Sequence, residues 1–230
     1  MTVQKRLLDI GIAVFGLLLS FPLFALIAVA IWFDDGRPII FRQRRIGRNG
    51  HIFYINKFRK FANDDFSSAP HVTLVNDERY SRVGKFLDKT KLNELPQLIN
   101  VLRGDMSIVG PRPEIPAFSH CFEGQHKALL EITPGIFGPS QTMFRNEADM
   151  YPPGRDANEF YESVLFPRKA ELDIEYYARA TIFSDLSWVI RSLVAVFMPP
   201  PMNIDELSKD GSNEQGRSIK ESRVRLKSTN

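Results

Sequence analysis

The chain has 230 residues, of which 43% are hydrophobic, and its 30 basic and 27 acidic residues leave a net charge of +3. This length suits one core of ordinary size with an appendage, and the small net charge argues against a nucleic-acid-binding protein. Cys121 is the only cysteine, which excludes an intrachain disulfide and is compatible with a reducing cytosol.

The first element is an apolar segment over residues 10–33, which carries no charged side chain and follows Lys5 and Arg6. It is long enough to cross a hydrocarbon layer, and no small-x-small cleavage pattern closes it, so we expect a membrane anchor rather than a signal peptide. Pro22 lies near its middle, where it removes a helical hydrogen bond and bends the axis.

Basic residues flank this segment on both sides. Lys5 and Arg6 precede it, and five arginines follow it closely: Arg37, Arg42, Arg44, Arg45 and Arg48. The positive-inside tendency pulls both ends towards the cytoplasm, which predicts a Pro-broken, re-entrant helix that enters and leaves by one face. A tilted crossing helix with a tolerated proline is the alternative.

A small β-hairpin is predicted next. Residues 38–42 and 51–59 alternate apolar and polar side chains around Gly47 and Asn49-Gly50, a turn sequence typical of hairpins. Lys57 and Arg59 are two apart, so on a strand they share one face, where they could receive a diphosphate; a solvated edge fits the spacing equally well. Residues 63–70 read as a loop, and residues 76–87 lead into a short helix.

The most informative stretch is residues 91–113, KLNELPQLINVLRGDMSIVGPRP. Its leucines recur at helical spacing, and Gly104 is expected to end the helix. Asn93 is expected to cap the helix start, with Pro96 in the first turn. Glu94 is in a position to hold a divalent cation, although a carboxylate there also simply favours the helix dipole.

The Pro111-Arg112-Pro113 turn follows this helix. Proline fixes the backbone on both sides of the arginine, so Arg112 can meet a phosphate with little ordering entropy left to lose. We expect the extended loop to return towards the helix start, where Glu94 lies.

The remaining chain reads as turns, then helix, then tail. Residues 133–147 are rich in turn-forming glycine and proline, and residues 160–197 show a helical pattern. With Trp188 and Arg191, the end of that pattern fits either the headgroup layer or ordinary core packing. Residues 199–230 contain no aromatic side chain, and we expect a mobile tail.

These motifs together resemble the bacterial sugar transferases, monotopic phosphoglycosyl transferases that load a sugar phosphate onto polyprenyl phosphate. The likeness covers about residues 3–198 and includes Lys57-Phe58-Arg59, residues 91–113 and Pro134-Gly135-Ile136. It implies an α/β fold, α-rich with a small β-hairpin. Residues 1–36 would be the re-entrant anchor, residues 37–198 a compact cytosolic catalytic domain with interfacial helices, and residues 199–230 the flexible tail.

The resemblance also implies a site. By that likeness Glu94 binds Mg²⁺, while Lys57, Arg59, Arg112 and Arg145 contact the phosphates or the uridine of a nucleotide sugar.

Two positions depart from the family. Members carry aspartate, taken to be the nucleophile, where this chain has Asn93, and a carboxamide oxygen is neutral and poorly nucleophilic. Asp88 stands where arginine is usual, so the chain loses one carboxylate and gains another nearby. Glu94 or Asp88 as the attacking carboxylate, or a direct transfer, are the alternatives.

The implied reaction transfers a sugar 1-phosphate from a UDP-sugar to undecaprenyl phosphate with release of UMP. It would initiate surface glycan synthesis at the cytoplasmic face of the bacterial inner membrane. Both substrates, membrane lipids and downstream glycosyltransferases are the expected partners, with a homodimer left open and nucleic acid not expected. A pseudo-enzyme or inactivated variant, which binds nucleotide sugar or recruits glycosyltransferases without chemistry, is the alternative from another class.

Overall fold

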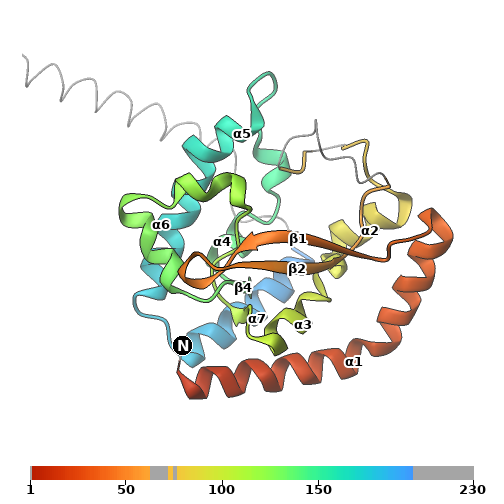
Figure 1. The fold of residues 1–230 in the computed structure, drawn as a ribbon, viewed down its shortest axis with the longest axis horizontal. Helices are drawn as coiled ribbons and strands as arrows, with labels where there is room; N and C mark the ends of the chain where they lie inside the picture. Colours follow the sequence, from red (N-terminus) through yellow and green to blue (C-terminus); the bar gives the residue numbers. More distant parts are fainter. Residues whose placement is uncertain (1, 63–71, 75–76, 199–230) are drawn as a thin grey trace, which may run out of the picture.

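The computed structural model describes residues 2–62, 72–74 and 77–198, so the predicted loop at 63–70 and the predicted tail at 199–230 lie outside the described residues. The described part is rich in helices and has two small sheets (Figure 1), as expected for an α-rich α/β protein. The helices are α1 (Val3–Asp35), α2 (Arg82–Thr90), α3 (Gln97–Arg103), α4 (Pro139–Met143), α5 (Ala157–Phe160), α6 (Phe166–Tyr177) and α7 (Ile182–Ala195). The strands are β1 (Ile40–Ile46), β2 (Ile52–Phe58), β3 (Ser107–Val109) and β4 (Gly135–Phe137).

Helix α1 is the expected apolar segment, and it continues through Pro22 as one bent helix rather than breaking there. It runs along one edge of the molecule and curves upward at its C-terminal end (Figure 1). The Ser20 hydroxyl donates to the Gly16 carbonyl at 2.6 Å, inside the turn that Pro22 perturbs. Among the described residues α1 is the one helix long and apolar enough to span a membrane, and only 11% of its most apolar window is buried.

Both ends of α1 are attached to the same body. Near the start, the buried Asp9 carboxylate accepts hydrogen bonds from the Ser107 hydroxyl at 2.8 Å and the Ile108 amide at 3.1 Å. At the far end, Asp34 accepts from the Val83 amide at 2.9 Å. Between these ends, the inner face of α1 packs on the core through side chains such as Ala13. The anchor is therefore part of the fold and not an appended tail.

The predicted hairpin is confirmed. Strands β1 and β2 pair antiparallel from Ile40 opposite Phe58 to Ile46 opposite Ile52. Asn49 and Gly50 take positive φ values of 57° and 77° in the turn, a conformation that asparagine and glycine adopt most readily.

The hairpin is fixed to α3 by a buried amide pair. The Asn100 side-chain oxygen accepts from the Asn56 backbone and side-chain amides, both at 2.9 Å. Its amide group donates to the Tyr54 carbonyl at 2.7 Å. Since buried polar groups need such partners, this pairing fixes how β2 and its Lys57 sit over α3.

A second, parallel sheet of two three-residue strands, β3 and β4, was not predicted. The backbone just after β3 touches the backbone at the start of β4. A Cβ built on Gly110 would lie 2.2 Å from the Thr133 carbonyl oxygen and 2.6 Å from the Gly135 nitrogen. Only glycine permits this approach, which brings the Pro111-Arg112-Pro113 turn beside the turn at residues 133–135.

The predicted helical stretch at 160–197 consists of α5, a π-helical turn, α6 and, after a break at residues 178–181, α7. Thr181 begins α7 with a capping box shared with Ser184. Several large apolar side chains of α7 are exposed: Phe183, Leu186, Ile190, Leu193 and Val194, followed by Phe197. The helix is therefore amphipathic with an uncovered apolar face.

Candidate active site

The structure brings Glu94, Lys57 and Arg112 together. Lys57 Nζ, at the end of β2, lies 2.9 Å from Glu94 Oε1 in the 3-10 turn η2 (Leu92–Glu94). Arg112 Nη2 lies 3.5 Å from the same oxygen. The expected return of the proline-arginine turn towards Glu94 is thus confirmed, from three segments that are far apart in the sequence.

Positive charge dominates this cluster. Burial alone would raise the pKa of Glu94, but the nearby Lys57, Arg112 and Lys91 outweigh it and hold that pKa well below its ordinary value. The carboxylate is therefore ionised at neutral pH. The Arg112 guanidinium stays charged, because Glu94 and Glu147 raise its pKa against the effect of burial. Burial lowers the pKa of Lys57 to about 7, because Arg112 and Arg45 add to it and Glu94 offsets it only in part. Lys57 is therefore only partly protonated at neutral pH. Arg112 and Lys91 still leave a positive excess over the Glu94 carboxylate, which attracts a polyanion such as a diphosphate.

A second arginine supports the turn from behind. The half-buried Arg45 of β1 donates to the Pro113 carbonyl at 2.9 Å and to the Gln43 side chain at 2.7 Å. Burial, with Arg112 nearby, lowers the pKa of Arg45 to about 10, so it remains charged at neutral pH. In the sequence, Arg45 stands out only as one of the basic residues that flank the apolar segment. Alternation along β1 could have revealed its inward side chain.

Behind Arg112 lies a buried ionic network that the sequence did not predict. Lys169 Nζ of α6 lies 2.9 Å from Glu147 Oε2, 3.0 Å from the Tyr161 hydroxyl and 3.9 Å from Glu114 Oε1. Tyr161 in turn donates to Glu114 at 2.5 Å. The two carboxylates exceed the one ammonium by one negative charge, which faces the Arg112 guanidinium.

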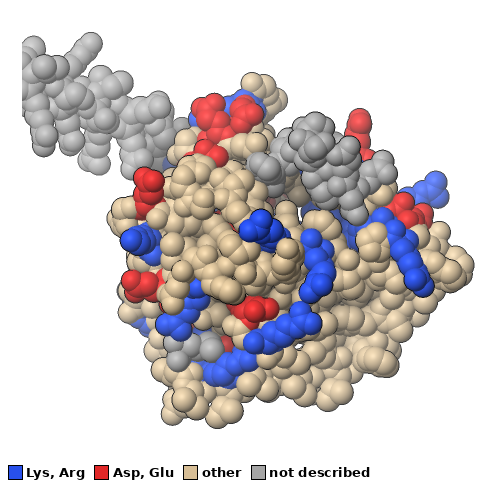
Figure 2. Space-filling view, in the orientation of Figure 1, with Lys and Arg blue, Asp and Glu red and all other residues tan. Residues whose placement is uncertain are grey.

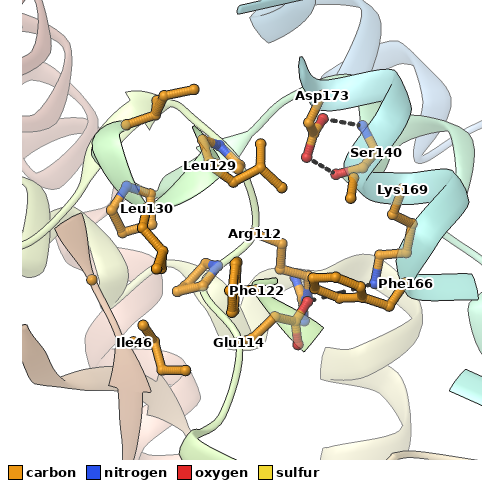
Figure 3. A pocket seen from close by; sticks show the side chains of 16 residues that line it. Ile46, Arg112, Glu114, Phe122, Leu129, Leu130, Ser140, Phe166, Lys169 and Asp173 are labelled. Atoms are coloured by element: carbon orange, nitrogen blue, oxygen red, sulfur yellow. Dashed lines mark hydrogen bonds and ion pairs between the residues drawn. The ribbon is translucent and has the colours of Figure 1, made fainter. Parts of the chain in front are cut away.

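Figure 3 shows Arg112, Glu114 and Lys169 converging on one side of a small cavity, with Leu129 and Leu130 from another segment opposite them. The cavity measures about 30 Å³, which is room for a water molecule or two. It is too small for a sugar, so a ligand of that size could reach Arg112 only from its open side, where the side chain is 35% exposed.

Asn93 lies inside η2 and does not cap a helix, so the predicted N-cap is wrong. Helix α3 starts only at Gln97, with Pro96 at its N-cap, because the chain first makes the separate 3-10 turn that Lys91 opens in a left-handed conformation, with φ of 59°. Asn93 is 2% exposed. Its side-chain oxygen is buried and accepts no hydrogen bond from any residue that the structure describes.

Asp88 forms a separate ion pair with Lys60. It binds Lys60 Nζ at 2.9 Å through one oxygen and accepts from the Tyr80 hydroxyl at 2.7 Å through the other. Burial raises the pKa of Asp88, but Lys60 and Lys91 outweigh it and lower the pKa to about 2. Both of its oxygens are therefore engaged in an ionised carboxylate.

The remaining site residues have other contacts. Arg59 is 6% exposed, pairs with Asp35 at 2.8 Å, and donates to the Asp35 and Gly36 carbonyls at the end of α1. Arg145 donates to the Met198 carbonyl. Within the described ranges no contact joins Arg59 or Arg145 to Glu94, and their expected substrate roles stay predictions.

A full protein cage for a metal ion is absent from the described part of the chain, which has no group of three or more His, Cys, Asp or Glu side chains suited to one. Mg²⁺ commonly uses only one or two protein ligands and takes the rest from phosphates and water. Glu94 is ionised, and the amide oxygen of Asn93, the preceding residue in the sequence, has no hydrogen-bond partner in the described part of the chain. Both are oxygen donors of the kind that Mg²⁺ prefers, so the residues present fit the expected ion.

A family model for bacterial sugar transferases matches residues 1–199. Among curated proteins, the chain is 35% identical over 207 residues to the galactosyl transferase CpsE of Streptococcus agalactiae, a match that spans 85% of this chain and 42% of the relative. It is 34% identical over 202 residues to the UDP-glucose:undecaprenyl-phosphate glucose-1-phosphate transferase of Escherichia coli, spanning 84% of this chain and 40% of the relative. It is 32% identical over 209 residues to the exopolysaccharide production protein ExoY of Sinorhizobium fredii, spanning 84% of this chain and 85% of that relative. The chain thus spans less than half of the first two relatives and most of the third.

Proposed function

The chain belongs to the bacterial sugar transferase family, and from that membership we propose that it transfers a sugar 1-phosphate from a UDP-sugar to undecaprenyl phosphate with release of UMP. The convergence of Lys57, Glu94 and Arg112 is the observation that carries the proposal, because it makes a cationic site for a diphosphate. The names of the relatives favour a working transferase, and nothing in the comparisons supports the pseudo-enzyme alternative.

In the proposed reaction an oxygen of the acceptor phosphate bonds to the sugar-bearing phosphorus of the donor. The bond from that phosphorus to the bridging oxygen breaks, and UMP leaves with the electron pair. Lys57 and Arg112 would stabilise the negative charge that spreads over the transferred phosphoryl group and the leaving UMP. Arg45 and the two prolines keep Arg112 in place, so little reorganisation is needed.

The state of the nearby carboxylates favours direct attack by the acceptor over a covalent phosphosugar intermediate. Asn93 is neutral. Glu94 Oε1 is bound by Lys57 and faces Arg112, and both oxygens of Asp88 are bound by Lys60 and Tyr80. A carboxylate that is held by cations in this way is a weaker nucleophile than a free one.

Mg²⁺ would be held by the Glu94 carboxylate and the Asn93 amide oxygen, together with donor phosphates and water. When bound, the ion would supply neutralisation of the diphosphate charge. Lys57 and Arg112 would orient the donor through its phosphates.

For the membrane we propose that α1 enters and leaves the cytoplasmic leaflet by one face, with the body at the surface. The attachment of both helix ends to one body supports this, as does the exposed outer face of α1, which includes Phe15, Leu18, Leu19, Phe21 and Leu26. In a Cys121→Ser background, cysteines at Thr2 and Arg37 should both be shielded from an impermeant thiol reagent in intact cells. Labelling of either one from outside would refute the placement.

The test of function is UMP release from a panel of UDP-sugars with undecaprenyl phosphate and Mg²⁺, run on the wild type, Asn93→Asp and Glu94→Gln. The wild type should release UMP only when the acceptor is present, because transfer is direct. Asn93→Asp should release up to one equivalent of UMP from donor alone, because the aspartate oxygen can bond to the sugar-bearing phosphorus and form an acyl phosphate as the bond from that phosphorus to UMP breaks. If neither the wild type nor Asn93→Asp turns over while both bind nucleotide, the transferase proposal fails.

A further inference from the structure

A groove of about 300 Å³ lies between the β1–β2 hairpin and α3. It is lined by two arginines, one asparagine and three apolar residues, with no acidic side chain: Ile40, Arg42, Asn56, Pro96, Ile99 and Arg103. The mixture of cationic and apolar lining differs from the active site, where Glu94 accompanies the cations. It suits an anion that carries an apolar chain.

The two arginines come from distant parts of the sequence and are both exposed, Arg42 on β1 and Arg103 in the last turn of α3. Neither forms an ion pair with a residue in the described ranges. The Arg42 guanidinium lies 5.8 Å from the centre of the Tyr54 ring, a cation–π contact that orients it and consumes none of its N–H donors. Guanidinium donors of this kind match the oxygens of a phosphate.

The groove lies beside the membrane helix. Ile39 and Leu95, which immediately precede the groove residues Ile40 and Pro96, pack against the cluster that holds α1. At the other end, Arg6 of α1 donates to the Val101 carbonyl at 2.6 Å and to the Leu102 carbonyl at 2.9 Å, just before Arg103. Figure 2 shows basic side chains gathered over the hairpin and α3, directly above the uncharged surface along α1.

We propose that this groove binds the headgroup of an anionic phospholipid. The inference rests on the membrane placement given under the proposed function, but it concerns a site separate from Glu94. The lipid phosphate accepts hydrogen bonds from Arg42 and Arg103, which are charge-assisted and therefore strong. The acyl chains run over Ile40 and Ile99 towards the exposed face of α1. Because Pro96 lines the groove two residues after Glu94, the bound lipid fixes how the active-site turn faces the bilayer.

The experiment measures the thermal unfolding midpoint of the full chain in neutral detergent as short-chain phosphatidylglycerol is titrated. Parallel titrations use phosphatidylcholine of the same chain length and inorganic phosphate. Phosphatidylglycerol should raise the midpoint of the wild type, because a ligand that binds only the folded state stabilises it. Arg42→Gln with Arg103→Gln should weaken the apparent affinity about 25-fold, from about fivefold for each arginine near a charged lipid surface.

The matched control removes two charges elsewhere, Lys127→Gln with Arg155→Gln, both exposed, and should leave the titration unchanged. Arg42→Lys with Arg103→Lys should retain most of the affinity, and Arg112→Gln should retain it fully, because the site is not the active site. An equal response to phosphatidylcholine or to inorganic phosphate, or an undiminished response in the double Gln variant, would overturn the lipid site. None of these readouts requires turnover, so a failed transferase assay leaves the test intact.

Discussion

Replacing Lys169 by methionine tests the buried network behind Arg112. The Lys169 side chain is 6% exposed and is the ammonium that offsets Glu147 and Glu114, whose side chains are 25% and 8% exposed. Methionine keeps the length of the side chain and removes the charge, which leaves both carboxylates without the ammonium group between them and with only the more distant Arg112 to offset them. Breaking a buried ion pair from one side costs about 3–5 kcal/mol. For a chain of this size that lowers the unfolding midpoint by about 6–20 °C.

The assay is thermal unfolding in neutral detergent at several pH values, with Lys169→Met and Glu147→Gln combined as the matched control. Burial raises the pKa of Glu147, but Lys169 outweighs it and holds the pKa below its ordinary value. A depressed carboxylate pKa contributes stability that is present above the unfolded pKa and lost as pH falls through the folded one. The deficit of Lys169→Met should therefore be largest at neutral pH and shrink below about pH 4.5. The double variant should recover part of it, and a single variant that loses less than about 1 kcal/mol at pH 7 would refute the reasoning.

Three further changes address other parts of the fold. Burial raises the pKa of Asp173 to about 6, so the wild type loses stability as pH rises from about 4 to 6. The stability of Asp173→Asn relative to the wild type should therefore increase by about 3 kcal/mol between pH 4 and pH 7.5. A difference in unfolding midpoint that does not change with pH would contradict this. Gly110→Ala places a Cβ 2.2 Å from the backbone and should lower the free energy of unfolding by about 3 kcal/mol or more. The control Gly11→Ala, whose Cβ would have nothing within 4 Å, should be neutral or slightly stabilising. Equal unfolding midpoints for the two variants would show that the backbone relieves the close approach at no cost. Arg59→Met removes the hydrogen bonds that hold the end of α1, so limited proteolysis near Gly36 should accelerate at least several-fold, and unchanged cleavage would exclude that role.

Features that depend on local sequence could be predicted from the sequence. The hairpin follows from Asn49-Gly50, and the end of α3 follows from Gly104, which takes the positive φ of 92° that a helix C-terminus requires. The meeting of Glu94 with Arg112 was also predicted, because two prolines leave the chain few ways to turn.

Features that depend on distant partners could not be predicted in this way. Strands β3 and β4 have three residues each, too few for a periodic signal. Lys169 reads as an ordinary polar position of an amphipathic helix, and only the packing of α6 on Glu114 and Glu147 shows its role. Arg59 follows Lys57 at strand spacing, yet the chain leaves the strand after Phe58 and directs Arg59 to the end of α1.

The two hydrogen bonds at Asp9 have a mechanical consequence. They join the first turns of the anchor directly to β3, and the same strand leads within a few residues into Pro111-Arg112-Pro113. A displacement of the first turns of α1 would therefore be passed through β3 to the turn that holds Arg112. Deleting the helix would leave the Ser107 hydroxyl and the Ile108 amide without the Asp9 carboxylate, so a fragment that begins after α1 should hold that turn less firmly than the full chain.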